Sequence, residues 1–334
     1  MRTDRTDLAG FVNADPLDLV FTTNATVAMN IVARSIDLSA NDEILTTDHE
    51  YGACDRMWGL LEEAHGFSTR RISLPLPLPT DDEIVEAIVG GMNDRTRLLF
   101  ISHITSPTAV ILPVERLCKA ARERGILTVV DGAHAIGHVP LDLHEMEVDF
   151  YTSNLHKWLC APKGSAFLFA RREVQHLLRP LVTSWGGNPV RDYDSPFIAQ
   201  HEYRGTREIA PALATGAAIA FRQKYRWDDV ARRCHTTLDE VGRTITDMFG
   251  WKAITSSGNP NAPHLQMLSF ILPSEIDGAA LHSYLATEQK VEIPVVDFNG
   301  IQTIRVSVQG YNTSEDFERL YGGIRSWLDL RSES

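Results

Sequence analysis

The chain has 334 residues, of which 43% are hydrophobic and 23% charged, a composition that excludes collagen-like, low-complexity and disordered proteins. Its 44 acidic residues outnumber its 32 basic ones, for a formal net charge of −12. This balance argues against a nucleic-acid partner, because surfaces that bind a phosphate backbone are basic. The length exceeds what one hydrophobic core usually supports and predicts a large domain with a smaller companion.

The four cysteines indicate neither a metal site nor a disulfide framework. They are Cys54, Cys118, Cys160 and Cys234, and no two of them form a CxxC pair. Scattered thiols of this kind are typical of a reducing compartment. Residues 1–8 lack the apolar stretch of a secretory signal, and the apolar runs elsewhere are too short to cross a bilayer. We therefore expect a cytoplasmic protein that binds no metal and no membrane.

In the first half of the chain, short β-rich runs alternate with amphipathic helical stretches. Strands are predicted at residues 19–23, 43–47, 69–74, 97–102, 127–131, 149–152 and 165–169. This alternation is typical of a mostly parallel sheet covered by helices on both faces. A helix is predicted between Pro113, which suits a first turn, and Gly125, which suits a helix end.

The pattern changes in the second half. Residues 210–246 are predicted to be helical, and later runs alternate as antiparallel strands do. Those runs are residues 266–272 and 303–308, with helices near 277–288 and 314–330. Thr313 is a hydroxyl N-cap with Asp316 three residues later. We expect a large domain over residues 1–225 and a smaller α+β domain over residues 226–334.

Asp131 and Lys157 are the most informative pair of residues. Asp131 closes a run of β-branched residues, and Lys157 follows the strand predicted at 149–152. In an open α/β sheet the carboxyl ends of the strands form a ligand crevice, so we expect both side chains there. One interpretation is a structural ion pair, the commoner role of such residues. The other is pyridoxal phosphate, which needs a lysine to bond to and an acid beside its pyridine nitrogen. His156 next to the lysine would help it lose its proton.

Several motifs, in this order, resemble the class V aminotransferases, the fold-type-I enzymes that include cysteine desulfurases. They are Asp131-Gly-Ala-His134, then Asp149-Phe-Tyr, and then His156-Lys157-Trp-Leu-Cys-Ala-Pro-Lys-Gly164. The last motif is most similar to the isopenicillin N epimerase-like branch, and the resemblance extends from about Leu19 to Leu330. It implies the α/β fold of type I pyridoxal-phosphate enzymes. This fold has a mostly parallel, seven-stranded-type sheet sandwiched by helices, plus a smaller C-terminal α+β domain.

The resemblance also implies which residues contact the cofactor, pyridoxal 5'-phosphate. Lys157 forms the Schiff base, Asp131 pairs with the pyridine nitrogen, and His134 contacts the phenolic oxygen. Ser153 and His156 belong to the same cofactor-binding region.

Two further segments resemble parts of the family that bind the cofactor's phosphate. Ala25 and Thr26 match a small-residue-plus-threonine turn entering a helix, where backbone amides and a hydroxyl suit a phosphate. An ordinary helix cap has the same residues. Thr206, after Gly205, resembles the loop that a neighbouring subunit sends to the phosphate, which implies a homodimer. Outside that context the loop is a plain surface turn.

The remaining site residues follow predicted strands. Tyr51 corresponds to the aromatic residue that stacks on the pyridine ring, or His49 does if the register differs by two. Ser106 lies where many relatives carry an asparagine near the cofactor's oxygen. Arg305 resembles the arginine that grips the α-carboxylate of an amino-acid substrate, a role that its planar fork suits.

The shared chemistry exchanges the lysine for the substrate's amine and then removes a group from the α-carbon, with Lys157 as acid or base. Cysteine desulfurases need a nucleophilic cysteine before the arginine strand, and no cysteine follows Cys234 here. We therefore expect no desulfurase. Racemisation or epimerisation is the first expectation, with Tyr51 or His49 as second proton carrier. A carbon–sulfur lyase is the alternative, with an aminotransferase or a catalytically impaired cofactor-binding relative behind it.

The first predicted strand begins near Leu19, which leaves almost no room for an element before it. Members of the family that this chain resembles carry an N-terminal segment before that strand, with a turn near the substrate. We therefore expect the cofactor site to be complete and turnover to be impaired.

Overall fold

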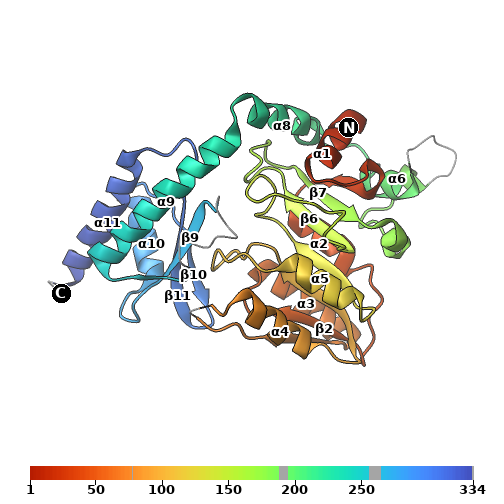
Figure 1. Ribbon diagram of the computed structural model, residues 1–334, viewed down its shortest axis with the longest axis horizontal. Helices are drawn as coiled ribbons and strands as arrows, with labels where there is room; N and C mark the ends of the chain where they lie inside the picture. The colour runs from red at the N-terminus through yellow and green to blue at the C-terminus, as the bar shows by residue number, and fades with distance from the viewer. Residues whose placement is uncertain (77, 188–194, 256–264, 333–334) are drawn as a thin grey trace. The chain divides into compact units, whose positions relative to one another are not determined.

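The computed structural model describes residues 1–76, 78–187, 195–255 and 265–332. The chain divides into two compact units (Figure 1). The first unit consists of Met1–Leu74, Pro79–Thr105 and Ile111–Tyr225, and the second of Pro75–Leu78, Ser106–Val110 and Arg226–Ser334.

The first unit is built on a seven-stranded sheet with the order β1-β7-β6-β5-β4-β2-β3. Its strands are β1 (Leu19–Thr22), β2 (Glu43–Thr47), β3 (Ser68–Ile72), β4 (Thr96–Ser102), β5 (Leu127–Asp131), β6 (Phe150–Asn154) and β7 (Ala166–Ala170). Only β7 runs against its neighbours, and because it is antiparallel to both β1 and β6, those two strands point the same way. The predicted strands are confirmed to within two residues, and so is the mostly parallel α/β fold.

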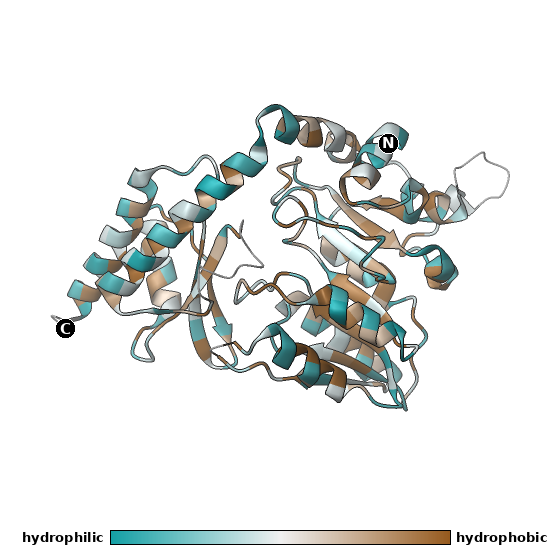
Figure 2. Cartoon of the chain, in the orientation of Figure 1, coloured by the Kyte–Doolittle hydropathy of each residue, from teal (hydrophilic) through white to brown (hydrophobic). Residues whose placement is uncertain are grey.

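Helices cover both faces of this sheet, as Figure 1 shows. They are α2 (Ala25–Ala33), α3 (Gly52–His65), α4 (Asp81–Gly91) and α5 (Val114–Arg122). Helices α2 and α3 pack with Leu98 and Phe100 of β4 in one apolar core. The alternate residues Leu99 and Ile101 are also fully buried and point to the other face, because successive side chains of a strand alternate. Burial on both faces explains the continuous apolar run at residues 98–101 of β4, and brown stretches are visible along the sheet in Figure 2.

Helix α5 confirms the clearest helix prediction. It begins directly after Pro113, and the residues at its apolar positions, Val114, Leu117, Cys118 and Ala121, are all buried. After it, Gly125 adopts a φ of 68°, a left-handed conformation that glycine takes without steric cost.

The remaining helical segments of the first unit include two before β1. They are α1 (Arg2–Phe11), η1 (Pro16–Asp18), η2 (Arg172–Leu177), η3 (Trp185–Gly187), α6 (Pro196–Glu202), α7 (Ala210–Leu213) and α8 (Thr215–Lys224). The expectation of no element before β1 was therefore wrong. Tertiary contacts hold α1, which packs against α8 and buries Leu8. Arg5 donates to the carboxylate of Glu202 at 2.8 Å, and the other carboxylate oxygen accepts from the backbone amide of Phe21.

The second unit is an antiparallel sheet with the order β10-β11-β9-β8 and three long helices in its described part. Its elements are α9 (Trp227–Phe249), β8 (Lys252–Ala253), β9 (Met267–Ile271), α10 (Gly278–Thr287), β10 (Val295–Phe298), β11 (Ile301–Ser307) and α11 (Ser314–Ser332). Residues of α9, such as Leu238 and Ile245, share one apolar core with the sheet and with α11. Asn299 and Gly300, both with positive φ, make the tight turn between β10 and β11.

The described helices include none that is both long and apolar enough to span a bilayer.

Candidate functional site

The polar residues of interest gather at one edge of the seven-stranded sheet. Because every strand except β7 runs in one direction, the carboxyl ends of the others share that edge. Ser102 and Asp131 end β4 and β5 there, and the segments that follow β1, β2 and β6 carry Ala25, Tyr51 and Lys157. This is the part of an open α/β sheet where ligands bind.

Asp131 is the last residue of β5, and its side chain is almost fully buried. One carboxylate oxygen accepts a hydrogen bond of 2.8 Å from the amide of Ala133, and the Cys54 thiol lies 3.7 Å from the other. Burial raises the pKa of Asp131, while the hydrogen bond from the Ala133 amide opposes that rise. A cationic ligand nitrogen at this carboxylate would hold it ionised.

Lys157 lies in the turn after β6 and meets His134, from the turn after β5. The Nζ atom of Lys157 is 2.8 Å from Nε2 of His134. On the other side of the imidazole, the indole nitrogen of Trp158 donates to Nδ1 at 3.2 Å. The structure thus joins an amine, an imidazole and an indole in one chain of contacts next to Asp131.

The turn after Asp131 depends on glycine. A Cβ atom on Gly132 would lie 2.2 Å from the hydroxyl oxygen of Tyr151, which is 2.9 Å from Nδ1 of His103. Burial lowers the pKa of His103 to about 4, so this imidazole stays neutral. The Ser153 hydroxyl donates to the carbonyl of Gly132 and accepts from the amide of Ile136. In this structure Ser153 therefore supports the turn that carries His134.

The start of α2 is tied to the end of β6. The Asn24 side chain caps the helix by accepting from Val27, and Asn154 accepts from the amide of Ala25 at 2.9 Å. Thr26 is exposed in the first turn of the helix. A helix N-terminus with an exposed hydroxyl is a suitable place for an anionic group.

The two alternatives for the stacking ring differ in exposure. Tyr51, the N-cap residue of α3, is 46% exposed. His49 is fully buried, with Nε2 at 2.9 Å from the carbonyl of Leu74, and burial lowers its pKa. His156 is half-buried, and its Nδ1 lies 2.7 Å from the carbonyl of Ser165. Only Tyr51 among these three rings is largely open to solvent.

Glu50 is a buried acid that the sequence analysis did not single out. Thr47 and Ser102 each donate to its carboxyl group at 2.6 Å. Burial, with the negative charge of Asp131 as a further cause, raises the pKa of Glu50 to about 8. No sequence pattern marks it, because it stands in a run of polar residues after a strand.

In the second unit, Arg305 of β11 contacts Ser106. Its Nη1 donates to both the carbonyl and the hydroxyl of Ser106, and burial lowers its pKa. Its Nε is buried, and among the described residues no acceptor reaches it. A carboxylate ligand would supply both the charge and the acceptor.

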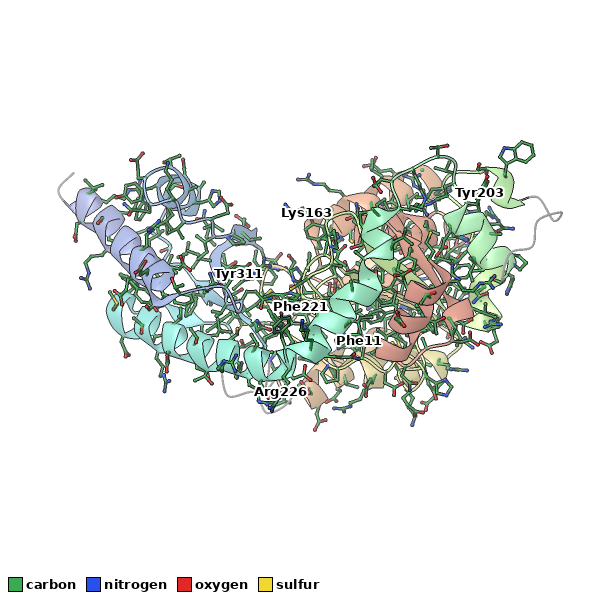
Figure 3. The ribbon with its side chains drawn as sticks, turned by 90° about the horizontal axis from the view of Figure 1, so that it is seen from above. Phe11, Lys163, Tyr203, Phe221, Arg226 and Tyr311 are labelled. Carbon is green, nitrogen blue, oxygen red and sulfur yellow. The ribbon has the colours of Figure 1, made fainter. Side chains whose placement is uncertain are left out.

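The loop after α6 is exposed. Thr206 is exposed, and Gly205 adopts a φ of 92°. Tyr203, labelled in Figure 3, ends α6 just before this loop and is 36% exposed. Among the described residues there is no cluster of three or more potential metal ligands.

Comparisons with known proteins agree with this architecture. The family model described as aminotransferase class-V matches residues 1–320. Isopenicillin N epimerase of Amycolatopsis lactamdurans is 38% identical, over 95% of this chain and 82% of that protein. The epimerase of Streptomyces clavuligerus is also 38% identical, over 95% and 81%. L-cysteine desulfhydrase of Arabidopsis thaliana is 30% identical, over 96% and 77%.

Solved structures share the fold. A C-DES mutant with glycine covalently linked to its PLP cofactor has a TM-score of 0.80 at 21% identity, over 96% of this chain and 83% of that chain. The apo cysteine desulfurase of Thermococcus onnurineus also has a TM-score of 0.80 at 21% identity, over 98% and 83%. These likenesses confirm the expected fold class.

The raised pKa of Glu50 predicts a pH-dependent stability. The group binds its proton more tightly in the folded chain than at the ordinary value of 4.5, so the free energy of unfolding falls as the pH rises from about 4.5 to about 8. Glu50→Gln should abolish this loss of free energy, which is on the order of a few kcal/mol. The melting temperature of the variant, relative to that of the wild type, should therefore rise between about pH 5 and pH 8. Thermal unfolding followed by circular dichroism measures this. The exposed Glu145→Gln serves as control, and parallel curves for wild type and Glu50→Gln would contradict the prediction.

Proposed function

Because the chain belongs to the aminotransferase class-V family, we propose that it is a pyridoxal-phosphate-dependent enzyme that epimerises or racemises the α-carbon of an amino acid. The observation that carries this proposal is the buried Asp131 carboxylate beside the Lys157–His134 contact, at the ligand-binding edge of the sheet. The two isopenicillin N epimerases at 38% identity support the choice of reaction.

The donor set fits pyridoxal phosphate. We assign the bond to the cofactor's aldehyde carbon to Lys157, the pyridine nitrogen to Asp131 and the phenolic oxygen to His134. Tyr51 offers an exposed ring to stack on the pyridine face, and Thr26 offers a hydroxyl at a helix N-terminus to the phosphate. When bound, the cofactor draws electrons from the bonds of the substrate's α-carbon.

Supporting roles in the cofactor site go to residues nearby. We propose that Ala25 contributes through the first turn of α2, and that Ser153 and His156 act by holding the turns around His134 and Lys157. Residues 1–225 would form the cofactor-binding domain and residues 226–334 the smaller one.

Inversion at the α-carbon needs two proton carriers, one on each face. We assign one to the Nζ atom of Lys157, which lies 2.8 Å from His134. We assign the other to the hydroxyl of Tyr51, because its side chain is open whereas the ring of His49 is fully buried. In this proposal one carrier removes the α-proton and the other delivers a proton to the opposite face. The two exchange roles in the reverse reaction.

The substrate's carboxylate would be held by Arg305. Its buried Nε, which has no acceptor in the part of the chain that the structure describes, is an open donor, and Ser106 orients the guanidinium from Nη1. A carboxylate bound through two parallel hydrogen bonds matches the planar fork of arginine. This contact selects amino acids over amines.

We further propose that the enzyme works as a homodimer in which the Gly205–Thr206 loop of one copy reaches the cofactor phosphate of the other. The loop is exposed, and the apolar side chains of Tyr203, Ile209 and Leu213 beside it are 36%, 39% and 42% exposed. A second copy that covers them would remove this apolar surface from water.

A carbon–sulfur lyase is the second candidate, favoured by the 30% identity to an L-cysteine desulfhydrase. Such a β-elimination uses Lys157 in the same way and yields pyruvate. We exclude a desulfurase from the proposal because no cysteine follows Cys234 and the exposed Cys160 belongs to the Lys157 turn.

The epimerase and the lyase form different products, which separates the two proposals. Incubation with pyridoxal phosphate and a panel of amino acids in deuterated water should place deuterium on the α-carbon of one amino acid without forming pyruvate. NMR and a pyruvate assay measure both. Pyruvate or released sulfide would favour the lyase. Lys157→Ala should abolish exchange and the cofactor's near-visible absorbance band, whereas the exposed Lys163→Ala should keep both. A wild-type protein without that band would contradict the proposed function.

Arg305→Lys should raise KM for the amino acid about tenfold or more and change kcat less, because lysine loses the second hydrogen bond of the fork. Steady-state kinetics measures both constants. Arg325→Lys, at an exposed position of α11, is the matched control. An unchanged KM in Arg305→Lys would show that another residue holds the carboxylate.

A further inference from the structure

Trp158 contacts the imidazole of His134 on the side opposite Lys157. Its indole nitrogen is 3.2 Å from Nδ1, while Nζ of Lys157 is 2.8 Å from Nε2. We propose that Trp158 is a positioning residue that keeps His134 neutral with its proton on Nε2, so that His134 always presents a hydrogen-bond donor to Lys157. This inference deepens the proposed function and rests on it.

The argument starts from the indole, which can only donate a hydrogen bond. Nδ1 of His134 must then hold a lone pair, and the single proton of the neutral ring lies on Nε2. A doubly protonated ring would set its Nδ1–H against the N–H of Trp158. The two contacts around His134 are therefore both hydrogen bonds only when its Nε2–H points at Lys157.

The same geometry determines the state of Lys157. At 2.8 Å from an N–H donor, Nζ has to accept through a lone pair, which an ammonium group lacks. The contacts thus favour the unprotonated amine of Lys157. That is the form that attacks an aldehyde carbon and the form that takes a proton from a substrate's α-carbon.

Trp158 is held firmly enough to act in this way. Its ring stacks on His138 with centroids 4.1 Å apart, and the imidazole of His138 contacts the carbonyl of His134 at 3.1 Å. Arg222 donates to the carbonyl of Trp158 at 3.2 Å. Gly137 lets that backbone approach, because a Cβ there would lie 2.7 Å from the same carbonyl. The indole N–H therefore has one direction in which to point.

The first test reads the tautomer itself. In protein labelled with ¹⁵N-histidine, with and without added pyridoxal phosphate, long-range ¹H–¹⁵N spectra should show His134 unprotonated at Nδ1 and protonated at Nε2 near neutral pH. The His134→Gln variant identifies the signals by their loss. A wild-type His134 with its proton on Nδ1, or with both nitrogens protonated, would overturn the inference whether or not any variant folds.

The matched pair of variants is Trp158→Phe and Trp58→Phe. Both remove a buried indole, but Trp58 has no acceptor for its N–H among the described residues. Trp158→Phe should move the proton of His134 to Nδ1 in at least part of the population, since Lys157 then donates to Nε2. Trp58→Phe should leave it on Nε2. An unchanged tautomer in a folded Trp158→Phe would contradict the role of Trp158.

A second readout is the rate at which cofactor-free protein takes up pyridoxal phosphate, followed by near-visible absorbance. Trp158→Phe should slow uptake about tenfold, because it removes one hydrogen bond to His134, the partner of the reacting amine of Lys157. Trp58→Phe should not slow it. In the His134→Gln background, where the amide donates in any case, adding Trp158→Phe should change the rate little. Equal slowing in both backgrounds would mean that Trp158 acts only through packing and would overturn the inference.

The two proposals fail in different ways. A wild-type protein that takes up no cofactor contradicts the proposed function, and the tautomer of His134 then still decides the inference. A protein that takes up cofactor normally but carries the His134 proton on Nδ1 contradicts the inference alone.

Discussion

The direction of the strands in the seven-stranded sheet decides where the polar groups of this protein meet. Every strand except β7 points the same way, so the segments that follow them emerge at one edge. The reversal of β7 lets β1 join the sheet without turning its carboxyl end to the other side. As a result, the start of α2 lies against the end of β6. There the side chain of Asn154, which precedes Lys157 by three residues, accepts a hydrogen bond from the amide of Ala25.

This edge concentrates charge in a buried place, and the pKa shifts show how the structure handles it. Burial raises the pKa of both Asp131 and Glu50, and the negative charge of Asp131 raises that of Glu50 further. Because burial and a neighbouring negative charge both oppose ionisation, Glu50, with a pKa of about 8, keeps its proton near neutral pH. Asp131, whose carboxylate accepts a hydrogen bond from the Ala133 amide, is the better placed of the two to pair with a cationic ligand.

Much of this architecture could be predicted from the sequence. The strands at Glu43–Thr47 and Leu127–Asp131 have the predicted ends, because both are rich in the β-branched residues that favour strands. Helix α1 could not be predicted, since its place depends on a buried ion pair with Glu202, far along the chain. The β10–β11 hairpin was missed although Asn299-Gly300 is a recognisable turn signal.

The residues of the site could be predicted from the sequence, but the hydrogen bonds that connect them could not. Motifs pointed to Asp131, His134 and Lys157, but the roles of Glu50, Asn154 and Trp158 depend on hydrogen bonds between segments that no local pattern relates. Trp158 stood inside the most informative motif. Its contact with His134 is visible only once two turns are brought together by neighbouring strands.

The central claim is that Lys157, placed beside Asp131 by the sheet, is the residue that bonds to pyridoxal phosphate. Reduction of the cofactor-treated protein with borohydride, followed by proteolysis and mass spectrometry, locates that bond. The account predicts a pyridoxyl group on Lys157 and none on Lys163, which lies in the same motif and is exposed. A pyridoxyl group on Lys163 or on another lysine, with Lys157 unmodified, would contradict it.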